Sequence, residues 1–531
     1  MDEMVMLADL VGGLNGEIAA RWRRVRELTL WRRHSDVQFA TEFRNELLLN
    51  PISSNPTASH SSFLLLRQWL RACDENHTQC HRQSVKESFW PKRVIYVSDR
   101  NKLTLVEEQP QGEDYLVLSH CWGDPGKEDH KRYWTTRVNY QGRLQGFNYD
   151  ELPKTFQDAV QVTRALQKQY LWIDALCIIQ GPNGDWDSEA KNMADIFAGA
   201  YCTIAASSAR GWGDGFLKPQ SNSPDIGVQG TPSTPTCACD FDKDVDKGPL
   251  MERAWVLQER VLSRRTIHFT AAHTYCECGA GVLCEQLTKL QPPFGKQYFI
   301  LDPNFPSRLN NSGFMRTVDF VRFLFKKYSI SGLTVETDRD VAIYSLVKRM
   351  GDVLATEVRY GIFRCFLGSL LLWRQTHENE TQPISYQGRT VPSWSWMAYS
   401  GGIDFLSDAK EDLTIPPRAD LDFTEGGKAL KVKVRRFGEN CRMEQKGKEH
   451  AIIDGVEKRV GSVWFNVADR FEFEYCVVVG MREDDKREDP EKTYYVLVIG
   501  KKDGDGGYKR LGVGMVEVQY VSSDCNDGTL W

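Results

Sequence analysis

The sequence lacks a long hydrophobic run, a basic charge balance and a secretory signal. Its most apolar stretches, such as Phe366–Trp373, are far shorter than the ~20 residues that a bilayer-spanning helix needs. The net charge is −5, so no overall positive charge favours a nucleic-acid partner. The N-terminus carries Asp2 and Glu3, and its apolar run is interrupted by Gly12, Gly13 and Glu17, which does not fit a signal peptide. We therefore predict a cytoplasmic protein with no membrane span and no bound nucleic acid.

A disulfide framework is not expected either. The chain has 14 cysteines in 531 residues, and several stand alone inside apolar segments, as buried thiols commonly do: Cys177, Cys202, Cys365 and Cys476. Without a secretory signal, this pattern favours a reduced protein. The sequence also contains no G-x-S-x-G elbow, Walker loop, H-E-x-x-H motif or internal repeat. These absences give no support to several common hydrolase and nucleotide-binding families.

What is present is an ordinary globular composition with clear changes along the chain. Hydrophobic residues make up 41% and charged residues 26%, and the length suggests about two to four domains. We predict a helical N-terminal lead-in at 1–90, an α/β domain at 91–290 with a loop or insertion at 217–249, a mainly helical region at 291–390, and a β-rich C-terminal region at 391–531. Within 291–390 the predicted helices are Phe314–Tyr328, Asp338–Met350 and Arg359–Trp373.

The α/β domain is predicted from alternating buried strands and amphipathic helices. Continuous apolar runs are typical of strands in a parallel sheet, whereas apolar residues three or four apart indicate helices. The strands are Tyr115–Ser119, Tyr170–Asp174, Tyr201–Ala206 and Arg265–Phe269, and the helices are Leu152–Gln167, Asp187–Ala200 and Leu250–Leu262. This alternation predicts a parallel sheet core.

Two candidate site segments follow predicted strands. Ser119-His120-Cys121-Trp122-Gly123 lies at the carboxyl end of the first strand, and Asp174 lies at the end of the second. Ligands of open α/β sheets bind outside these ends, where Ser119, Trp122 and Gly123 could hydrogen-bond and stack a ligand. The alternatives are a turn anchored by Trp122 and an aspartate that caps the next turn.

A third candidate is the predicted helix that carries Trp255 and Glu259. The two residues are four apart and therefore share one helix face. A ring beside a carboxylate could line a nucleobase or nicotinamide pocket. The alternative is a core tryptophan with Glu259 paired to Arg253, Arg260 or Arg264, and spacing alone favours this alternative.

A fourth candidate is a group of metal-ligating residue types. Cys73, His77, Cys80 and His81 lie close together in the sequence, and Cys276, Cys278 or Cys284 could complete a zinc site. Their spacing is irregular, however, and no second pair stands at a zinc-finger distance. Cys239 belongs to a Cys-Ala-Cys segment within the predicted insertion. We therefore assign no metal site from the sequence.

The ordered segments together resemble the fungal heterokaryon incompatibility (HET) domain. The resemblance rests on the order and spacing of six segments: YLVLSHCWG at Tyr115–Gly123, LPKTFQDAVQV at Leu152–Val162, YLWIDALCIIQ at Tyr170–Gln180, MADIFAGAYCTIAA at Met193–Ala206, GFL at Gly215–Leu217 and RAWVLQERVLSRR at Arg253–Arg265. Weaker similarity extends upstream to the Cys73/His77/Cys80 segment and Pro91–Val97, and downstream to Leu333–Leu346 and Val391–Trp396.

This resemblance implies a role in fungal non-self recognition and programmed cell death. HET domains are considered remote relatives of TIR domains, which have a flavodoxin-like α/β fold, and some TIR domains hydrolyse NAD⁺ with one glutamate. In that pattern a tryptophan precedes the glutamate by four residues, as Trp255 precedes Glu259 here. The resemblance thus makes Glu259 the candidate catalytic residue. It assigns NAD⁺ binding to Ser119, Trp122, Gly123, Asp174 and Trp255.

The implied reaction needs no cofactor, because NAD⁺ itself is the substrate. The resemblance also implies self-association through the HET domain, whereas the non-self partner is not indicated by the sequence. The alternative function is a non-catalytic death-signalling module that binds a nucleotide or a second HET domain.

Overall fold

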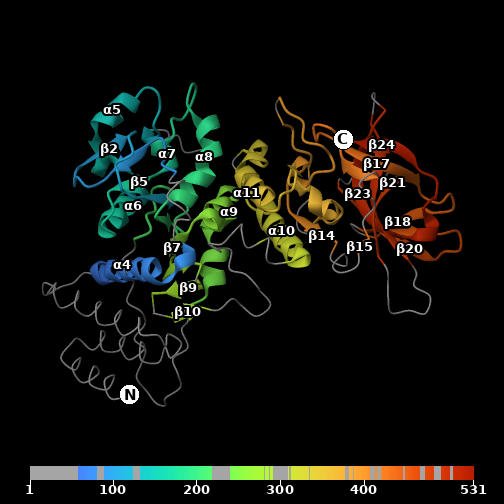
Figure 1. The fold of residues 1–531 in the computed structure, drawn as a ribbon, viewed down its shortest axis with the longest axis horizontal. Coiled ribbons are helices and arrows are strands. Elements are labelled where there is room, and N and C mark those ends of the chain that lie inside the picture. The colour runs from blue at the N-terminus through green and yellow to red at the C-terminus, as the bar shows by residue number, and fades with distance from the viewer. Residues whose placement is uncertain are drawn as a thin grey trace, which may run out of the picture. The chain divides into compact units, whose positions relative to one another are not determined.

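The computed structural model describes two compact units, which meet in sequence between Phe305 and Pro306. Each unit has its own large sheet (Figure 1). Each unit also has its own hydrophobic core. The described residues are 58–80, 89–123, 132–217, 239–279, 281–285, 288–290, 309, 313–333, 335–376, 382–386, 388–406, 413–414, 420–446, 449–466, 473–482, 492–502 and 506–531. Most of the predicted lead-in, at 1–57 and 81–88, lies outside these ranges.

A mixed sheet forms the centre of unit 1. Its strand order is β10-β9-β8-β7-β6-β3-β5-β1-β2-β4. The strands are β1 (Val94–Tyr96), β2 (Lys102–Val106), β3 (Tyr115–Ser119), β4 (Phe147–Asn148), β5 (Tyr170–Trp172), β6 (Cys202–Ala205), β7 (Arg265–Phe269), β8 (Thr274–Cys278), β9 (Gly281–Cys284) and β10 (Thr288–Leu290). Only the pairs β5-β3, β3-β6 and β6-β7 are parallel among these strands. The α/β class is confirmed, but the sheet is mixed because antiparallel hairpins extend both edges of its parallel centre.

The helices of unit 1 connect and cover these strands (Figure 1). They are α4 (Ala58–Asn76), α5 (Tyr140–Gln145), α6 (Lys154–Ala165), α7 (Asp174–Cys177), α8 (Trp186–Gly199) and α9 (Ala254–Leu262), with short helical turns η1 (Thr78–Cys80), η4 (Tyr149–Glu151), η5 (Asp242–Asp246) and η6 (Pro249–Glu252). Helix α6 is amphipathic, and its Phe156, Val160 and Thr163 are buried.

The spatial order of the four parallel strands is β5, β3, β6 and β7. The chain begins at β3, continues to β5 on one side of it, and then crosses to β6 and β7 on the other side. In chain order they are arranged 2-1-3-4, the arrangement in which a doubly wound flavodoxin-like sheet begins. Right-handed crossovers place α6 and α8 on opposite faces, because the chain moves in opposite directions across the sheet in the two connections. The carboxyl ends of β3 and β6 therefore border the crevice where such sheets bind ligands.

Burial explains why β3 can occupy the centre of this sheet. All five of its residues, including Ser119, are buried. A strand with parallel neighbours on both sides and helices over both faces has no solvent-facing side, so a continuous apolar run is expected. Ser119 is the polar residue at the end of this apolar run, and its buried hydroxyl needs a hydrogen-bond partner inside the protein.

The segment from Cys239 to the start of α9 packs against β8 and β9. Phe241 and Val245 are buried beside Tyr275. Cys239 and Cys284 form a disulfide in this region. The sequence predicts a reduced chain without a disulfide framework, and this single pair departs from the reduced state because the end of the predicted insertion folds back onto β9. The rest of that insertion, at 218–238, lies outside the described residues.

Unit 2 begins with helices and continues into a large antiparallel sheet. Its helices are α10 (Phe314–Ser329), α11 (Val341–Val353) and α12 (Leu367–Leu371), with the short turns η8 (Glu336–Asp338), η9 (Arg364–Phe366), η10 (Trp396–Ala398) and η11 (Val518–Tyr520). Its first strands are β11 (Val358–Arg359), β12 (Ile362–Phe363), β13 (Trp373–Gln375) and β14 (Ile403–Phe405). The predicted helix Arg359–Trp373 is largely wrong. Tyr360 and Gly361 both have positive φ and form a two-residue hairpin turn, which the helical periodicity concealed.

The β-rich C-terminal region is confirmed. The remaining strands are β15 (Leu413–Thr414), β16 (Leu421–Phe423), β17 (Leu430–Arg436), β18 (Arg442–Lys446), β19 (Glu449–Ile453), β20 (Arg459–Phe465), β21 (Tyr475–Arg482), β22 (Thr493–Lys501), β23 (Tyr508–Glu517) and β24 (Asn526–Leu530). Pairings from β17 through β21, β22, β23 and β24 return to β17 and so form a closed ring of strands. None of the described helices combines the length and apolar character that a bilayer span requires.

Candidate functional site

The first feature at the crevice is a contact between Ser119 and Glu259. Ser119 is the last residue of β3, and Glu259 lies in the middle of α9. The Ser119 hydroxyl donates a hydrogen bond to Glu259 Oε2 at 2.5 Å. The Ser263 hydroxyl, one turn further along the chain, donates to the Glu259 carbonyl at 2.6 Å. Two residues 140 positions apart in the sequence are thus in direct contact beside the strand-order reversal.

The Glu259 carboxyl is buried, and its exposed fraction is only 8%. Burial raises the pKa of Glu259 to about 7, whereas the Ser119 hydrogen bond lowers it; nearby Asp174 raises it and Arg253 lowers it. The three arginines that could have paired with this carboxylate bind elsewhere. Arg253 donates to the His120 carbonyl, Arg264 to the Ala200 carbonyl, and Arg260 to other carboxylates.

A second contact joins Trp122 to Asp174. Trp122 follows β3, and its indole Nε1 donates to Asp174 Oδ2 at 2.7 Å. Asp174 begins α7, where its Oδ1 accepts the backbone N–H of Ala175 at 2.7 Å. Ile173, not Asp174, is the N-cap residue of α7, so the alternative of a capping aspartate is wrong, and the Asp174 carboxylate instead contacts the segment after β3. The Trp122 ring packs against the rings of Trp134 and Trp212 at centroid distances of 5.7 and 5.6 Å.

His120 lies between the two contacts. Its Nε2 is 3.7 Å from Asp174 Oδ1 and has no hydrogen-bond partner among the described residues. Burial lowers the pKa of His120 to about 4, an effect that Asp174 opposes. A neutral imidazole beside the Asp174 carboxyl group adds a polar group without adding charge. His120 was not among the residues assigned to the site from the sequence.

The structure places Gly123 through its backbone conformation and Trp255 through packing against a neighbouring helix. Gly123 has a φ of +80°, a backbone conformation that favours glycine, directly after the Trp122 segment. Trp255 lies on α9, and its ring packs edge-on against Trp186 of α8 at 5.9 Å. The structure thus brings Ser119 to Glu259 and Trp122 to Asp174, and it gives Trp255 a packing partner in the neighbouring helix.

A small cavity adjoins Ser119 on the side of β6 and β7. Ser207, Thr203 and His268 line it, together with Arg260. The guanidinium of this lining Arg260 donates hydrogen bonds to both carboxylate oxygens of Glu277, at 2.7 and 2.9 Å.

The sequence analysis missed this charged cluster, because Arg260, Glu277 and His268 lie on three different elements. Arg260 also pairs with Asp246 at 2.6 Å, and His268 Nε2 lies 2.9 Å from Glu277 Oε2. Burial would raise the pKa of Glu277, but Arg260 outweighs it and holds that pKa at about 2. In this buried ion-pair network Arg260 binds two carboxylates, those of Glu277 and Asp246.

The structure assembles three of the metal-ligating residue types with a distant cysteine. Cys73, His77 and Cys80 meet Cys278 of β8, whereas Cys276 and Cys284 lie outside this group. His81 lies outside the described residues. Cys239, His273 and Cys284 form a second group, but its two cysteines are joined as a disulfide.

One comparison with known proteins identifies a related family. Residues 115–259 match the family model described as "Heterokaryon incompatibility protein (HET)". The match begins at the first residue of β3 and ends at Glu259, so it contains every residue of the Ser119–Glu259 and Trp122–Asp174 contacts. It supports a heterokaryon incompatibility domain in this part of the chain. Neither the curated proteins nor the solved structures gave a significant match.

Proposed function

We propose that this chain acts in heterokaryon incompatibility and that its HET domain hydrolyses NAD⁺ at the nicotinamide glycosidic bond, with Glu259 as the catalytic residue. The observation that carries the proposal is the Ser119–Glu259 contact at the carboxyl ends of the parallel strands. The flavodoxin-like order of those strands supports the TIR-like relationship on which the proposal rests.

The energetics of Glu259 favour a functional role over a structural one. A buried carboxylate without a cationic partner costs stability whenever it is ionised. A glutamine or an apolar residue would fill the same space on α9 without that cost. Carboxyl groups with a pKa raised by burial, placed in a crevice, are characteristic of sites that need a reactive acid or base.

The ionised carboxylate suits the chemistry of this bond. As the bond between ribose C1′ and the pyridinium nitrogen breaks, its electron pair leaves with nicotinamide and the ribose becomes oxocarbenium-like. The Glu259 carboxylate would stabilise that positive charge or hold the ribose hydroxyls. Water then adds at C1′, gives ADP-ribose and releases one proton. Because the leaving group departs as neutral nicotinamide, no separate strong general acid is required.

Ser119 and Asp174 would orient the riboses, and Trp122 or Trp255 would stack a ring of the dinucleotide. Access requires a local opening, because Glu259 is only 8% exposed. Self-association through the HET domain is the proposed trigger of that opening, so turnover should rise more steeply than protein concentration.

A second function is favoured by the same burial. A closed crevice with a protonated Glu259 would serve a non-catalytic module that signals by binding a nucleotide or another HET domain. In that case the glutamate would regulate binding, and no nicotinamide would be released. The two functions differ in a single measurable product.

The test uses the full chain with NAD⁺ over a range of protein concentrations and measures free nicotinamide. We expect release by the wild type and at least a 100-fold loss in Glu259→Gln. Glu189→Gln is the matched control, because Glu189 is also a buried glutamate whose pKa is raised by burial, on α8. No release by a folded, concentrated wild type would contradict catalysis and leave the binding module. Equal release by wild type and Glu259→Gln would remove Glu259 from the reaction.

A further inference from the structure

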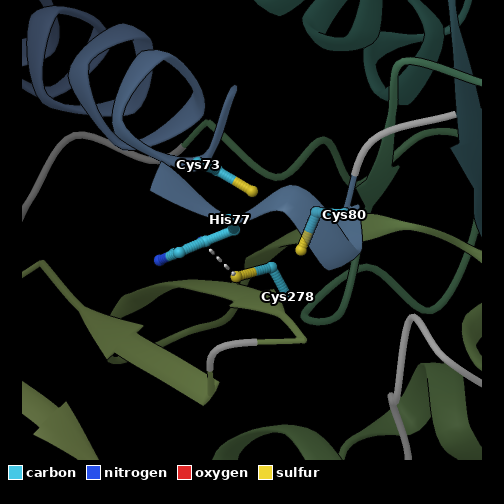
Figure 2. Close-up of side chains that lie close together, drawn as sticks. All are labelled: Cys73, His77, Cys80 and Cys278. Atoms are coloured by element: carbon cyan, nitrogen blue, oxygen red, sulfur yellow. Dashed lines mark hydrogen bonds between the residues drawn. The ribbon is translucent and has the colours of Figure 1, made fainter. Parts of the chain in front are cut away.

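Four side chains able to bind a soft metal ion meet at one edge of unit 1. Cys73 comes from α4, His77 and Cys80 from the turn after it, and Cys278 from the end of β8. One ligand atom from each residue lies within 4.8 Å of those of the other three. Figure 2 shows the three sulfurs turned toward one another, with the His77 ring beside Cys278.

Local backbone geometry explains how three of them converge. The His77 N–H donates to the Cys73 carbonyl at 3.0 Å, and the Cys80 N–H donates to the His77 carbonyl at 2.8 Å. The chain thus winds tightly from the end of α4 into η1, so residues four and then three positions apart face the same side. The irregular Cys-x3-His-x2-Cys spacing fits this turn.

The fourth residue comes from far along the chain. Cys278 lies 201 residues after His77, and its sulfur is 3.4 Å from His77 Nδ1. The backbone N–H of Gly279 also donates a hydrogen bond to the Cys80 sulfur. Such N–H donors stabilise thiolate ligands in the second shell of a metal site.

The burial of these groups sets them apart from ordinary core cysteines. Cys73, Cys80 and Cys278 are 2%, 0% and 6% exposed, and they form a buried cluster made of cysteines alone. The other buried thiols of unit 1, such as Cys202 and Cys276, belong instead to the large apolar core. Valine or leucine would pack equally well at the positions of Cys73, Cys80 and Cys278. Three sulfurs and an imidazole, however, share the ability to ligate zinc.

We propose that Cys73, His77, Cys80 and Cys278 form a structural zinc site. Tetrahedral zinc with sulfur bonds of ~2.3 Å and nitrogen bonds of ~2.0 Å separates its ligand atoms by roughly 3.5–3.8 Å. The 3.4 Å contact and the 4.8 Å limit of the cluster bracket these separations. Three cysteines and one histidine complete the coordination, so no position is left for substrate and the site is structural rather than catalytic.

The site would fasten the lead-in helix to the sheet. Asp74, next to Cys73, already accepts hydrogen bonds from Arg265 of β7 at 2.6 Å and from the Tyr201 hydroxyl at 2.7 Å. A zinc ion bound to α4, η1 and β8 would reinforce the same junction on its other side. The segment before the HET-matching residues thereby becomes part of the domain rather than a separate extension.

The experiment measures zinc in the full chain, purified without added metal, by inductively coupled plasma mass spectrometry. We expect about one zinc ion per chain, as a single closed site requires. Cys278→Ser should lose it, and Cys276→Ala is the matched control, because Cys276 lies two residues away on the same strand but outside the cluster. His77→Cys keeps four soft ligands and should retain the metal.

A second measurement guards against a variant that fails to fold. Cobalt(II) exchanged into the wild type should give the visible d–d and sulfur charge-transfer bands of a tetrahedral site with thiolate ligands. Wild type without zinc that takes up neither zinc nor cobalt while folded would overturn the proposal. So would zinc that persists in Cys278→Ser but is lost in Cys284→Ser, or alkylation under denaturing conditions that finds two of the cluster thiols joined as a disulfide.

Discussion

Two buried glutamates of unit 1, Glu259 and Glu277, have opposite electrostatic surroundings. Glu277 accepts hydrogen bonds from Nε and Nη2 of Arg260 and lies beside His268, and its pKa is about 2. Glu259 receives one hydroxyl, and its pKa is about 7. Glu259 and Arg260 are neighbours on α9, yet successive helix residues point about 100° apart, so they serve different sites. Glu277 is ion-paired with Arg260, whereas the Glu259 carboxyl forms no arginine ion pair among the described residues.

The largest expected effect comes from breaking the ion-paired side of this comparison. Glu277→Gln removes the charge that accepts two hydrogen bonds from the buried Arg260 and leaves Asp246 as its anionic partner, which should cost about 3 kcal/mol of stability. Hydrogen–deuterium exchange of peptides from β7 and β8 measures this loss in the full chain. Glu75→Gln is the control, because its exposed i,i+4 pair with Arg71 should change stability by less than about 0.5 kcal/mol. Equal effects of the two substitutions would mean that the buried Arg260–Glu277 ion pair does not stabilise unit 1.

Glu259→Gln, in contrast, should make the protein more stable than the wild type at alkaline pH. The folded-state pKa of about 7 exceeds the ordinary value of 4.5, so the folded wild type holds a proton that the unfolded chain releases. Wild-type stability therefore falls as pH rises from 4.5 through 7, and the glutamine variant escapes this fall. Compared with pH 5, the variant should gain on the order of 2–3 kcal/mol over the wild type at pH 8. Exchange rates of β3 and α9 peptides at the two pH values measure the gain, and parallel pH profiles would contradict it.

Ser119→Ala should have a smaller effect, which is a change in the pKa of Glu259. The hydroxyl lowers the pKa of Glu259, so its removal should raise that pKa further, by up to about one pH unit for a hydrogen bond worth about 1 kcal/mol. Infrared difference spectroscopy measures this through the protonated carboxyl band that disappears in Glu259→Gln. Ser263→Ala is a useful control, because the Ser263 hydroxyl contacts the Glu259 backbone and not its carboxyl. An unchanged or lowered pKa in Ser119→Ala would refute the role of this contact.

The parallel centre of unit 1 was predictable because its signals are local. Strands β3 and β7 have the predicted bounds, Tyr115–Ser119 and Arg265–Phe269, and α6 lies inside the predicted helix. Each has either an unbroken apolar run or one apolar helix face, which short-range sequence patterns record. The β11–β12 hairpin was missed because the positive φ of a non-glycine residue, Tyr360, leaves no such signal.

The contacts of the site were less predictable, because they join distant segments. Spacing on α9 favoured an arginine partner for Glu259, but the structure gives it Ser119, 140 residues earlier. The same holds for Cys278, whose role depends on where β8 ends relative to α4. The GFL segment, Gly215–Leu217, also depends on a contact with a distant residue. The N–H groups of Phe216 and Leu217 donate to the buried Asp158 carboxylate, a tertiary anchor that the letters alone do not disclose.

The pH dependence of nicotinamide release by the full chain tests the central claim most directly. If the Glu259 carboxylate acts in catalysis, kcat/KM for NAD⁺ should rise with pH through about 7 in the wild type, and Glu259→Gln should show no such rise because its activity is lost. Release that has no acid limb near pH 7, or that persists in Glu259→Gln with the wild-type profile, would contradict the claim.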